Sequence, residues 1–415
     1  MVKGEKILEG YRATEAGILP IDWQVKRLSE VATELTERAG QDKYETVSIS
    51  AGIGFVNQAE KFGKELSGKQ YEKYVVLHQG DFSYNKGNSK TSPQCCIYRL
   101  NDRETAAVPN VFESFRIEGQ NADYYEQLFL SGFLNKQLYS KSNRGVRDDG
   151  LLNLTGKDFY GCTVPVPPIV EQKKIAEILA QCDKIISFKQ EQLEEEKQKK
   201  QWMIENILTG KVRVGDFSVS WENTTIGNCS EYLVGYPFSS EGFSDDGIRL
   251  IRGSNVKRGK LSWELALTMY WPEDDKLDQF FLKCGDIVIA MDGALVGRSF
   301  AMIQSADIPS YLVQRVARIR SEINNLLVQW IGSDKFARHI DSRKTSTAIP
   351  HITIHDILSF PICIPKSKQE ADVIGNILKT QDNLLCMLEE ELAELKSRKI
   401  ALMQLLLTGI VRVKL

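Results

Sequence analysis

One sequence pattern occurs twice in this chain. Ile-Ala-Glu-Ile-Leu at 175–179 begins a long helical stretch that ends with Leu-Thr-Gly at 208–210 and Val-Arg-Val at 212–214. The second copy starts 199 residues later, with Ile-Gly-Asn-Ile-Leu at 374–378, and ends with Leu-Thr-Gly at 407–409 and Val-Arg-Val at 411–413. We therefore expect two tandem halves, each a globular stretch followed by one long helix. A chain with such pseudo-two-fold symmetry suits a target that also has two halves.

In both copies the helical residues that face a partner recur alternately at steps of four and three, the spacing of a helix that packs along another helix. In the first helix this seam is Ile175, Leu179, Cys182, Ile186, Lys189, Leu193, Glu196, Lys200, Met203 and Ile207. In the second helix it is Ile374, Leu378, Gln381, Leu385, Leu388, Leu392, Leu395, Lys399, Leu402 and Leu406. A parallel pairing would place charged residues of the first helix opposite leucines of the second. We therefore predict an antiparallel coiled coil, with Lys200 near Gln381 and Cys182 near Lys399.

Both helices have clear ends. Prolines come before each helix and a glycine after it: Pro165, Pro167, Pro168 and Gly210 for the first, and Pro361, Pro365 and Gly409 for the second. Proline is tolerated only before or within the first turn of a helix, and glycine commonly ends one. About 33 residues at ~1.5 Å each give a helix roughly 50 Å long. The alternative, a core helix within one domain, is disfavoured because the stripe is long, repeated and flanked by charged faces.

The globular halves share weaker similarities. Trp23 corresponds to Trp221, Gly80-Asp81 to Gly285-Asp286, and the segment 154–158 to 352–356, while the sequence between these positions diverges. We predict an α+β chain with two pseudo-symmetric α/β domains separated by the antiparallel coiled coil. The expected boundaries are an N-terminal arm at 1–21, a first domain at 22–165, a first long helix at 166–214, a second domain at 215–363 and a second long helix at 364–415.

Basic and amide side chains gather on glycine-containing loops of both halves. The candidates in the first half are Asn85, Lys86, Asn88, Lys90, Arg144 and Arg147, and those in the second are Arg252, Asn255, Lys257, Arg258, Arg298, Arg343 and Lys344. Such groups bind phosphates and read base edges in a DNA groove. The alternative is that these loops are only solvated, but their recurrence in both halves favours DNA binding. Because the net charge is −2, a surface for DNA must be local, or a partner must supply part of it.

Sequence motifs for catalysis are missing. There is no phosphate-binding loop of the G-x-x-x-x-G-K-[ST] type, no G-x-S-x-G elbow and no amino-methyltransferase motif. His351 and His355 have the spacing of a metal pair, but a proline precedes them and no glutamate follows His351, so no metal site is expected. The eight cysteines contain no C-x-x-C pair, and no signal peptide or membrane span is evident. We expect a cytoplasmic, non-catalytic binding protein with no cofactor of its own.

The chain resembles the DNA-specificity subunit of type I restriction–modification enzymes over essentially its whole length. The resemblance is carried by Val-Pro-Val-Pro-Pro-Ile-Val-Glu-Gln-Lys-Lys-Ile-Ala-Glu-Ile-Leu at 164–179, its echo Ile-Pro-Lys-Ser-Lys-Gln-Glu at 364–370, the two Leu-Thr-Gly-x-Val-Arg-Val segments and Ile-Asp-Trp at 21–23. The second copy departs from the family pattern at Lys366, where a second proline is usual.

The resemblance implies that each globular half is a target-recognition domain that reads one half of a bipartite site in double-stranded DNA. The paired helices would set the spacer and dock two methyltransferase (modification) subunits, which carry S-adenosylmethionine. A motor–nuclease (restriction) subunit that uses ATP and Mg would join them. The base-reading residues of the family follow no motif, so none is transferred to this chain.

Two alternatives stay open. A coiled-coil scaffold that does not bind DNA would explain the helices but would leave the basic loops unused. A DNA methyltransferase-like protein with its own catalytic site would need the missing motifs. Salt-dependent DNA binding of the chain with its partner tests the first alternative, and cofactor binding by the purified chain tests the second.

Overall fold

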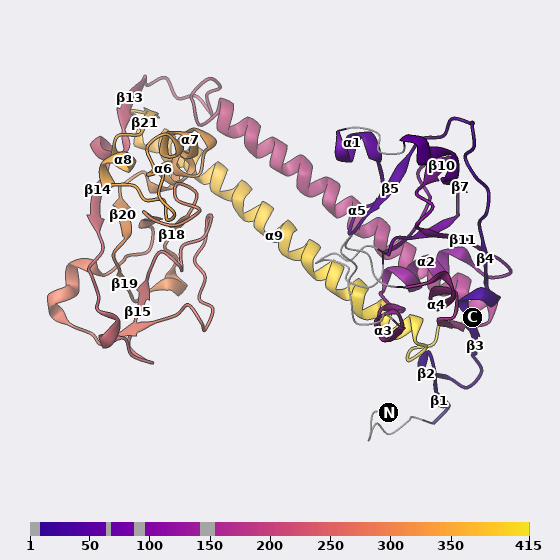
Figure 1. The fold of residues 1–415 in the computed structure, drawn as a ribbon. Coiled ribbons are helices and arrows are strands. Elements are labelled where there is room, and N and C mark those ends of the chain that lie inside the picture. The colour runs from indigo at the N-terminus through magenta and orange to yellow at the C-terminus, as the bar shows by residue number, and fades with distance from the viewer. Residues whose placement is uncertain (1–8, 64–67, 87–95, 142–153, 415) are drawn as a thin grey trace. The chain divides into compact units, whose positions relative to one another are not determined.

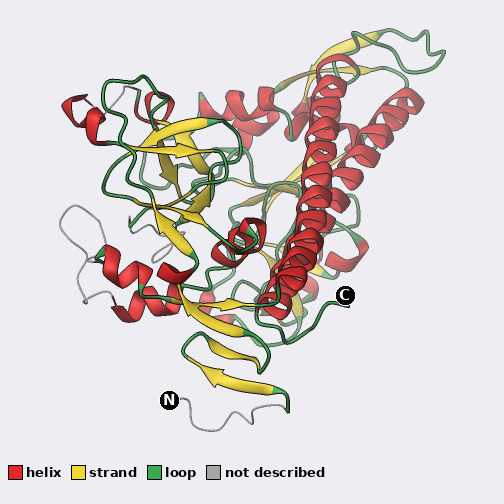
Figure 2. Ribbon diagram, turned by 90° about the vertical axis from the view of Figure 1, so that its right-hand side faces the viewer, coloured by secondary structure: helices red, strands yellow, loops and turns green. Residues whose placement is uncertain are grey.

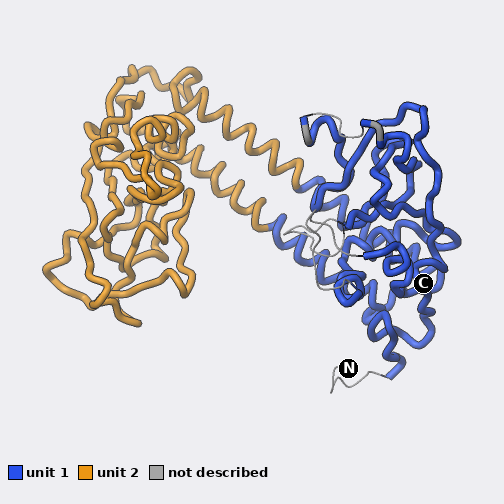
Figure 3. The backbone as a smooth tube through the Cα atoms, in the orientation of Figure 1, with its two compact units in different colours: residues 1–189, 391–415 blue, residues 190–390 orange. Residues whose placement is uncertain are grey.

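The computed structural model describes residues 9–63, 68–86, 96–141 and 154–414. The chain divides into two compact units, coloured separately in Figure 3: unit 1 contains residues 1–189 and 391–415, and unit 2 contains residues 190–390. Two long helices, α5 (Ile169–Asn206) and α9 (Lys368–Leu407), each begin in one unit and end in the other. Each unit therefore combines a globular domain with a part of both helices.

Unit 1 is built around a four-stranded antiparallel sheet with smaller paired strands beside it (Figure 1). The sheet has the order β4 (Ala32–Glu34), β11 (Glu113–Ile117), β8 (Phe82–Tyr84) and β9 (Ile97–Arg99). The other pairs are β1 (Tyr11–Thr14) with β2 (Gly17–Pro20), β3 (Gln24–Arg27) with β12 (Thr163–Val166), β5 (Val47–Ser50) with β6 (Gly54–Asn57), and β7 (Val75–His78) with β10 (Thr105–Val108). The short helices are α1 (Gln58–Phe62), α2 (Ala122–Leu130), α3 (Asn135–Lys141), α4 (Gly156–Tyr160), η1 (Leu28–Glu30) and η2 (Gly68–Lys73).

Unit 2 repeats this frame. Its four-stranded sheet has the order β14 (Glu231–Val234), β20 (Val316–Arg320), β17 (Ile287–Ala290) and β18 (Phe300–Met302), and β13 (Trp221–Thr225) pairs with β21 (Pro361–Pro365). In place of the β7–β10 pair it has three strands, β16 (Tyr270–Trp271), β15 (Ile248–Ile251) and β19 (Ser310–Leu312). The helices are α6 (Asn324–Ile331), α7 (Asp334–Asp341), α8 (Ile354–Leu358), η3 (Ile226–Cys229), η4 (Ser240–Gly242), η5 (Asp275–Phe280) and η6 (Ser305–Asp307). The predicted α+β fold with two pseudo-symmetric domains is confirmed.

The largest hydrophobic core of each unit joins the four-stranded sheet to both long helices. In unit 1 it includes Phe115 of β11, Leu128 of α2, Leu179 of α5 and Leu406 of α9. The core of unit 2 likewise contains side chains of β20, α6 and α9, together with Ile207 and Leu208 directly after α5. Complete burial of one such side chain contributes about 1.5–3 kcal/mol. The globular domains are therefore anchored on the helices by apolar contacts rather than by a flexible linker.

Ion pairs show the direction in which α5 and α9 pack on one another in unit 1. Lys399 Nζ lies 2.5 Å from Asp183 Oδ1, and Lys189 Nζ lies 2.9 Å from Glu391 Oε2. As the position on α5 rises, the position of its partner on α9 falls, so the two helices run antiparallel. Lys189, which the sequence places opposite leucines, turns its ammonium group towards a carboxylate at the edge of the seam.

Unit 2 contains the other part of the same antiparallel pair (Figures 1 and 2). Gln381 Nε2 donates to Glu196 Oε2 at 2.6 Å, and Lys200 forms an ion pair with Asp382. The predicted neighbourhood of Lys200 and Gln381 is therefore present, and the predicted antiparallel coiled coil is confirmed. Every predicted seam side chain on both helices is buried or half-buried.

The weaker sequence similarities also correspond to repeated structure. Thr155 with Asp158 forms a capping box at the start of α4, and Thr353 with Asp356 forms the same box at the start of α8. In each unit a buried aspartate before the central strand accepts two hydrogen bonds from an arginine of the neighbouring strand. These pairs are Asp81 with Arg116 and Asp286 with Arg320.

Candidate nucleic-acid interface and the junctions that carry it

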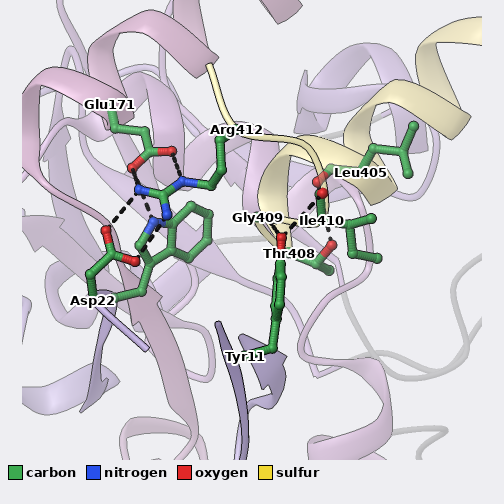
Figure 4. A network of polar contacts seen from close by, with 9 residues as sticks. Tyr11, Asp22, Glu171, Leu405, Thr408, Gly409, Ile410 and Arg412 are labelled. Carbon is green, nitrogen blue, oxygen red and sulfur yellow. Dashed lines mark hydrogen bonds and ion pairs between the residues drawn. The ribbon is translucent and has the colours of Figure 1, made fainter. Parts of the chain in front are cut away.

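A polar junction in unit 1 joins the first turn of α5 to the tail that follows α9 (Figure 4). Trp23 Nε1 donates to Glu171 Oε2 at 3.0 Å, and Arg412 donates to both oxygens of Glu171, from Nε at 2.7 Å and from Nη2 at 2.9 Å. The Glu171 side chain is 1% exposed, and a buried carboxylate of this kind requires charge-assisted hydrogen bonds. Arg412 also binds Asp22, and its hydrogen bond lowers the pKa of that carboxyl. Tyr11 completes the junction, because its hydroxyl donates to the carbonyl of Gly409 at 2.8 Å.

Unit 2 contains the same junction, built from the equivalent residues. Trp221 Nε1 donates to Glu370 Oε1 at 3.1 Å, and Arg213 donates to Glu370 from Nε at 2.7 Å and from Nη2 at 2.8 Å. Arg213 follows α5, whereas Glu370 lies at the start of α9. The tail of each long helix therefore completes the globular domain on which the other long helix begins. The repeated Trp, Glu and Val-Arg-Val motifs are the parts of this junction.

The described candidates of the first half are held by interactions within unit 1. Lys86 Nζ forms an ion pair with Glu113 Oε1 at 2.6 Å, and both side chains are largely buried. Asn85 is half-buried, and its Nδ2 donates to the carbonyl of Ile49 at 3.4 Å. The other candidates, Asn88, Lys90, Arg144 and Arg147, lie outside the described residues.

In the second half, Asn255 does not fit the predicted role of a DNA contact. It is fully buried, its Nδ2 donates to the carbonyls of Ser262 and Leu267, and its Oδ1 accepts from the backbone nitrogen of Arg252. Asparagine often forms such turns because its short amide reaches the neighbouring backbone. Asn255 therefore shapes the loop. Arg252 is half-buried, and its Nη2 donates to the carbonyl of Leu267 at 2.7 Å.

Lys257 and Arg258 lie on a tight turn next to β18. The turn closes at Gly259, whose φ of +77° is a conformation that glycine adopts without strain. Arg258 forms a β-bridge with Phe300, the first residue of β18. Arg258 is exposed and Lys257 is half-buried. This turn therefore presents an exposed cation, Arg258.

A second basic group surrounds Asp341 at the end of α7. Arg298 donates to both oxygens of Asp341, at 3.1 and 2.6 Å, and Lys344 Nζ lies 2.7 Å from Asp341 Oδ1. The hydrogen bond from Arg298 is the main reason why the pKa of Asp341 lies well below its ordinary value. Arg343 is exposed, and its Nη1 donates to the carbonyl of His339. Two of these three candidate cations therefore share one carboxylate.

A cavity of about 490 Å³ in unit 2 contains cations that the sequence analysis missed. Lys260 from the turn and Lys379 from α9 line it together with Arg258. Within the described residues, none of the three has an ion-pair partner. Lys260 directly follows the predicted turn residues and could have been included with them. Lys379 gave no such signal, because it is a single lysine outside the helix seam.

The described part of the chain contains no group of three or more His, Cys, Asp or Glu side chains placed to hold a metal ion. His351 lies instead against Thr345, with Nδ1 3.0 Å from the hydroxyl oxygen. None of the described helices is long and apolar enough to span a membrane.

Known proteins resemble this chain in sequence. A family model described as the type I restriction modification DNA specificity domain matches residues 20–197 and again residues 220–397. The type I restriction enzyme MjaVIII specificity subunit of Methanocaldococcus jannaschii is 29% identical over 304 residues, which cover 69% of this chain and 70% of that protein. The putative MjaX specificity subunit of the same organism is 23% identical over 439 residues, covering 98% of this chain and 97% of that protein.

The fold is also similar to a solved structure. The crystal structure of the type I restriction–modification S subunit from M. genitalium has a TM-score of 0.59 at 13% identity, and the match covers 93% of this chain and 96% of that one. The two matches of the family model include most of each long helix and both junction tryptophans. This chain belongs to the DNA-specificity subunits of type I restriction–modification systems.

Proposed function

We propose that the globular domain of each unit is a recognition domain that reads one half of a bipartite site in double-stranded DNA. The main observation behind this proposal is that the two units share the same junction and the same four-stranded sheet but differ in the strands beyond that sheet. Both units have the Trp–Glu–Arg junction and the same order of strands in the four-stranded sheet, but their second layers differ. Two domains with a common frame and different loops suit two different half-sites.

The paired helices set the length of the spacer between the half-sites. α5 and α9 run without interruption for 38 and 40 residues, or roughly 57 and 60 Å at ~1.5 Å per residue. Half-sites on one face of a duplex recur about every 34–36 Å. A stiff helix pair of this length is sufficient to hold two domains on successive turns.

The outer faces of the helices dock two copies of a methyltransferase subunit. Phe188 on α5 is 69% exposed and Met387 on α9 is 66% exposed, and the two occupy equivalent positions of the repeat. Each has an apolar neighbour three residues earlier, Ile185 or Leu384. Ile185 is exposed and Leu384 is half-buried. Exposed apolar side chains that adjoin other apolar side chains are features of interaction surfaces, and two equivalent surfaces fit two copies of one partner.

Catalysis is supplied by the partners. The methyltransferase subunits bring S-adenosylmethionine, and a motor–nuclease subunit, where present, brings ATP and Mg. This chain contributes sequence recognition and assembly. Its net charge of −2 is consistent with partners that provide part of the phosphate contacts.

The test is methylome sequencing of cells that express the chain with its methyltransferase partner. The expected result is one methylated motif made of two short sequences around an unread spacer. Replacement of residues 22–165 by the same domain of another specificity subunit should change only one of the two sequences. A continuous motif, or a change in both sequences, would contradict the proposal.

A further inference from the structure

Each unit contains one polar cluster at which three elements meet. In unit 1, Gln127 Nε2 of α2 donates to Asp183 Oδ2 of α5 at 3.1 Å, and Lys399 Nζ of α9 lies 2.5 Å from the other carboxylate oxygen. The aspartate thus binds a helix of the globular domain with one oxygen and the opposite long helix with the other.

The same cluster occurs in unit 2. Gln329 Nε2 of α6 donates to Asp382 Oδ2 at 2.8 Å, and Lys200 of α5 pairs with Asp382 Oδ1. Asp382 and Lys200 correspond to Asp183 and Lys399 in the repeat, but the two long helices have exchanged roles. The two clusters have the same connectivity although the loops of the two units differ. This indicates that both clusters hold a globular domain on the helix pair in the same way.

The glutamines distinguish these clusters from the other contacts between α5 and α9. Gln127 is 8% exposed and Gln329 is 5% exposed, so both amides are held where they have few alternative partners. The ion pairs Lys189–Glu391 and Lys197–Glu389 also join the two helices, each through one lysine of α5 and one glutamate of α9. Each glutamine cluster connects a helix of the globular domain to both long helices at once.

Hydrogen bonds are directional, so these clusters can restrict the rotation of a globular domain on the helices. The domains are attached to the helices mainly by apolar contacts, and the hydrophobic effect is non-directional. An apolar interface tolerates small rotations, whereas a hydrogen bond weakens steeply when its angle changes. A charge-assisted bond at the end of a rigid helix therefore limits how far the domain can turn about the helix pair.

We propose that Gln127 with Asp183 and Gln329 with Asp382 are positioning residues that set the angle of each recognition domain on the helix pair, and thereby the spacer length that is accepted. The inference rests on the proposed function, because spacer selectivity exists only if the two domains read one bipartite site. It assigns no base contact to these residues.

The experiment uses the full chain in complex with its methyltransferase partner. The variants are Q127M, Q329M and their combination, because methionine keeps the side-chain volume and removes the hydrogen bond. The matched controls are E391Q and E389Q, each of which weakens a contact between α5 and α9 without touching a recognition domain. The probes are duplexes that carry the two half-sites found by methylome sequencing, with the native spacer or a spacer one base pair longer or shorter.

We expect each single glutamine variant to reduce the preference for the native spacer, and the double variant to reduce it by about tenfold, the scale of one charge-assisted hydrogen bond. Binding to the native-spacer duplex should fall much less, since the base contacts are intact. The controls should keep the preference of the unaltered protein. D183N and D382N, which keep the shape of the aspartate but weaken both of its contacts, should behave like the glutamine variants.

The outcomes separate the two proposals. If the unaltered complex binds a bipartite duplex with a spacer preference and Q127M/Q329M keeps that preference, the positioning role is refuted and the proposed function stands. An equal loss in E391Q and E389Q also refutes it, because any contact between the helices would then suffice. If the unaltered complex shows no spacer preference, the proposed function fails and the inference fails with it.

Discussion

The two units use the same frame where they meet the long helices and differ in the layers beyond the four-stranded sheet. The Trp–Glu–Arg junctions, the capping boxes of α4 and α8 and the glutamine clusters occur in both units with equivalent residues. Beyond that sheet, unit 1 has the strand pairs β7–β10 and β5–β6, whereas unit 2 has the three-stranded sheet β16–β15–β19. The comparison shows which interactions belong to the scaffold and which part of each domain is free to vary.

The divergence begins within the shared sheet. In unit 1 the buried hydroxyls of Ser83 and Ser114 lie 3.1 Å apart on paired strands. The equivalent paired positions in unit 2 hold Val288 and Arg318. Burial lowers the pKa of Arg318, and its Nε has no hydrogen-bond partner within the described residues. The face of the sheet turned away from the long helices therefore differs in polarity between the units, while the opposite face keeps its apolar character.

The largest expected effect concerns one seam position that differs between the two helices. Leu388 is buried, whereas the equivalent residue of α5 is Lys189, which reaches Glu391. Leu388→Arg should destabilise the chain by about 4 kcal/mol, because it loses a buried leucine and places a charge in the seam. Lys189→Leu, the matched exchange, should change stability by less than about 1 kcal/mol. Thermal unfolding measures the stability of both variants. Equal losses of stability would contradict the prediction, because they would mean that the two positions have equivalent environments.

The second prediction tests whether the two junctions are equivalent. Glu171→Ala and Glu370→Ala each leave a tryptophan and an arginine without their buried carboxylate, so each should cost about 3 kcal/mol. The two losses should agree within about 1 kcal/mol in denaturant unfolding. If only one of the two variants lost stability, only one of the two junctions would stabilise its unit.

Much of the scaffold could be predicted from the sequence, because its signals are local or repeated. The heptad pattern identified the seam of α5 and α9, and the charges on it favoured the antiparallel direction that the ion pairs show. The junction partners could not be paired in advance. Trp23, Glu171 and Arg412 come from distant segments, and a repeated motif does not state what its residues contact.

The candidate DNA contacts were less predictable for a related reason. The presence of Lys, Arg and Asn on a loop does not reveal which of these side chains already bind other residues of the same domain. Asn255 stabilises its own turn, and Lys86 and Arg298 are bound by carboxylates from distant segments. Tertiary contacts of this kind decide which cations stay available, and a single sequence contains no record of them.

The third prediction concerns a close approach of a domain to its helix at Gly375. A Cβ on Gly375 of α9 would lie 2.8 Å from the backbone of Asn325, whereas the equivalent position of α5 holds Ala176. Gly375→Ala should therefore destabilise unit 2 by about 2 kcal/mol despite its better helix propensity, because the added methyl overpacks the interface. Ala176→Gly should cost only about 1 kcal/mol, through helix propensity. Stabilisation by Gly375→Ala would contradict the close contact.

The smallest expected effect is on DNA affinity. Asp341→Asn removes the carboxylate shared by Arg298 and Lys344, so the two cations become available to phosphates. Affinity for any duplex should rise about two- to threefold at low salt, and the salt dependence should steepen, because additional counterions are released on binding. Fluorescence anisotropy at several salt concentrations measures both quantities. A change restricted to one half-site sequence would indicate that Arg298 or Lys344 reads a base.

The central claim is that the antiparallel helix pair sets the distance between two reading domains. Its most direct test inserts one heptad into α5 after Lys189 and a matching heptad into α9 before Glu391, so that the register of the pair is preserved. Seven residues at ~1.5 Å add about 10 Å, or roughly three base pairs of DNA. Methylome sequencing should then show the same two half-sites around a spacer about three base pairs longer. Retention of the original spacer by this lengthened protein would contradict the account.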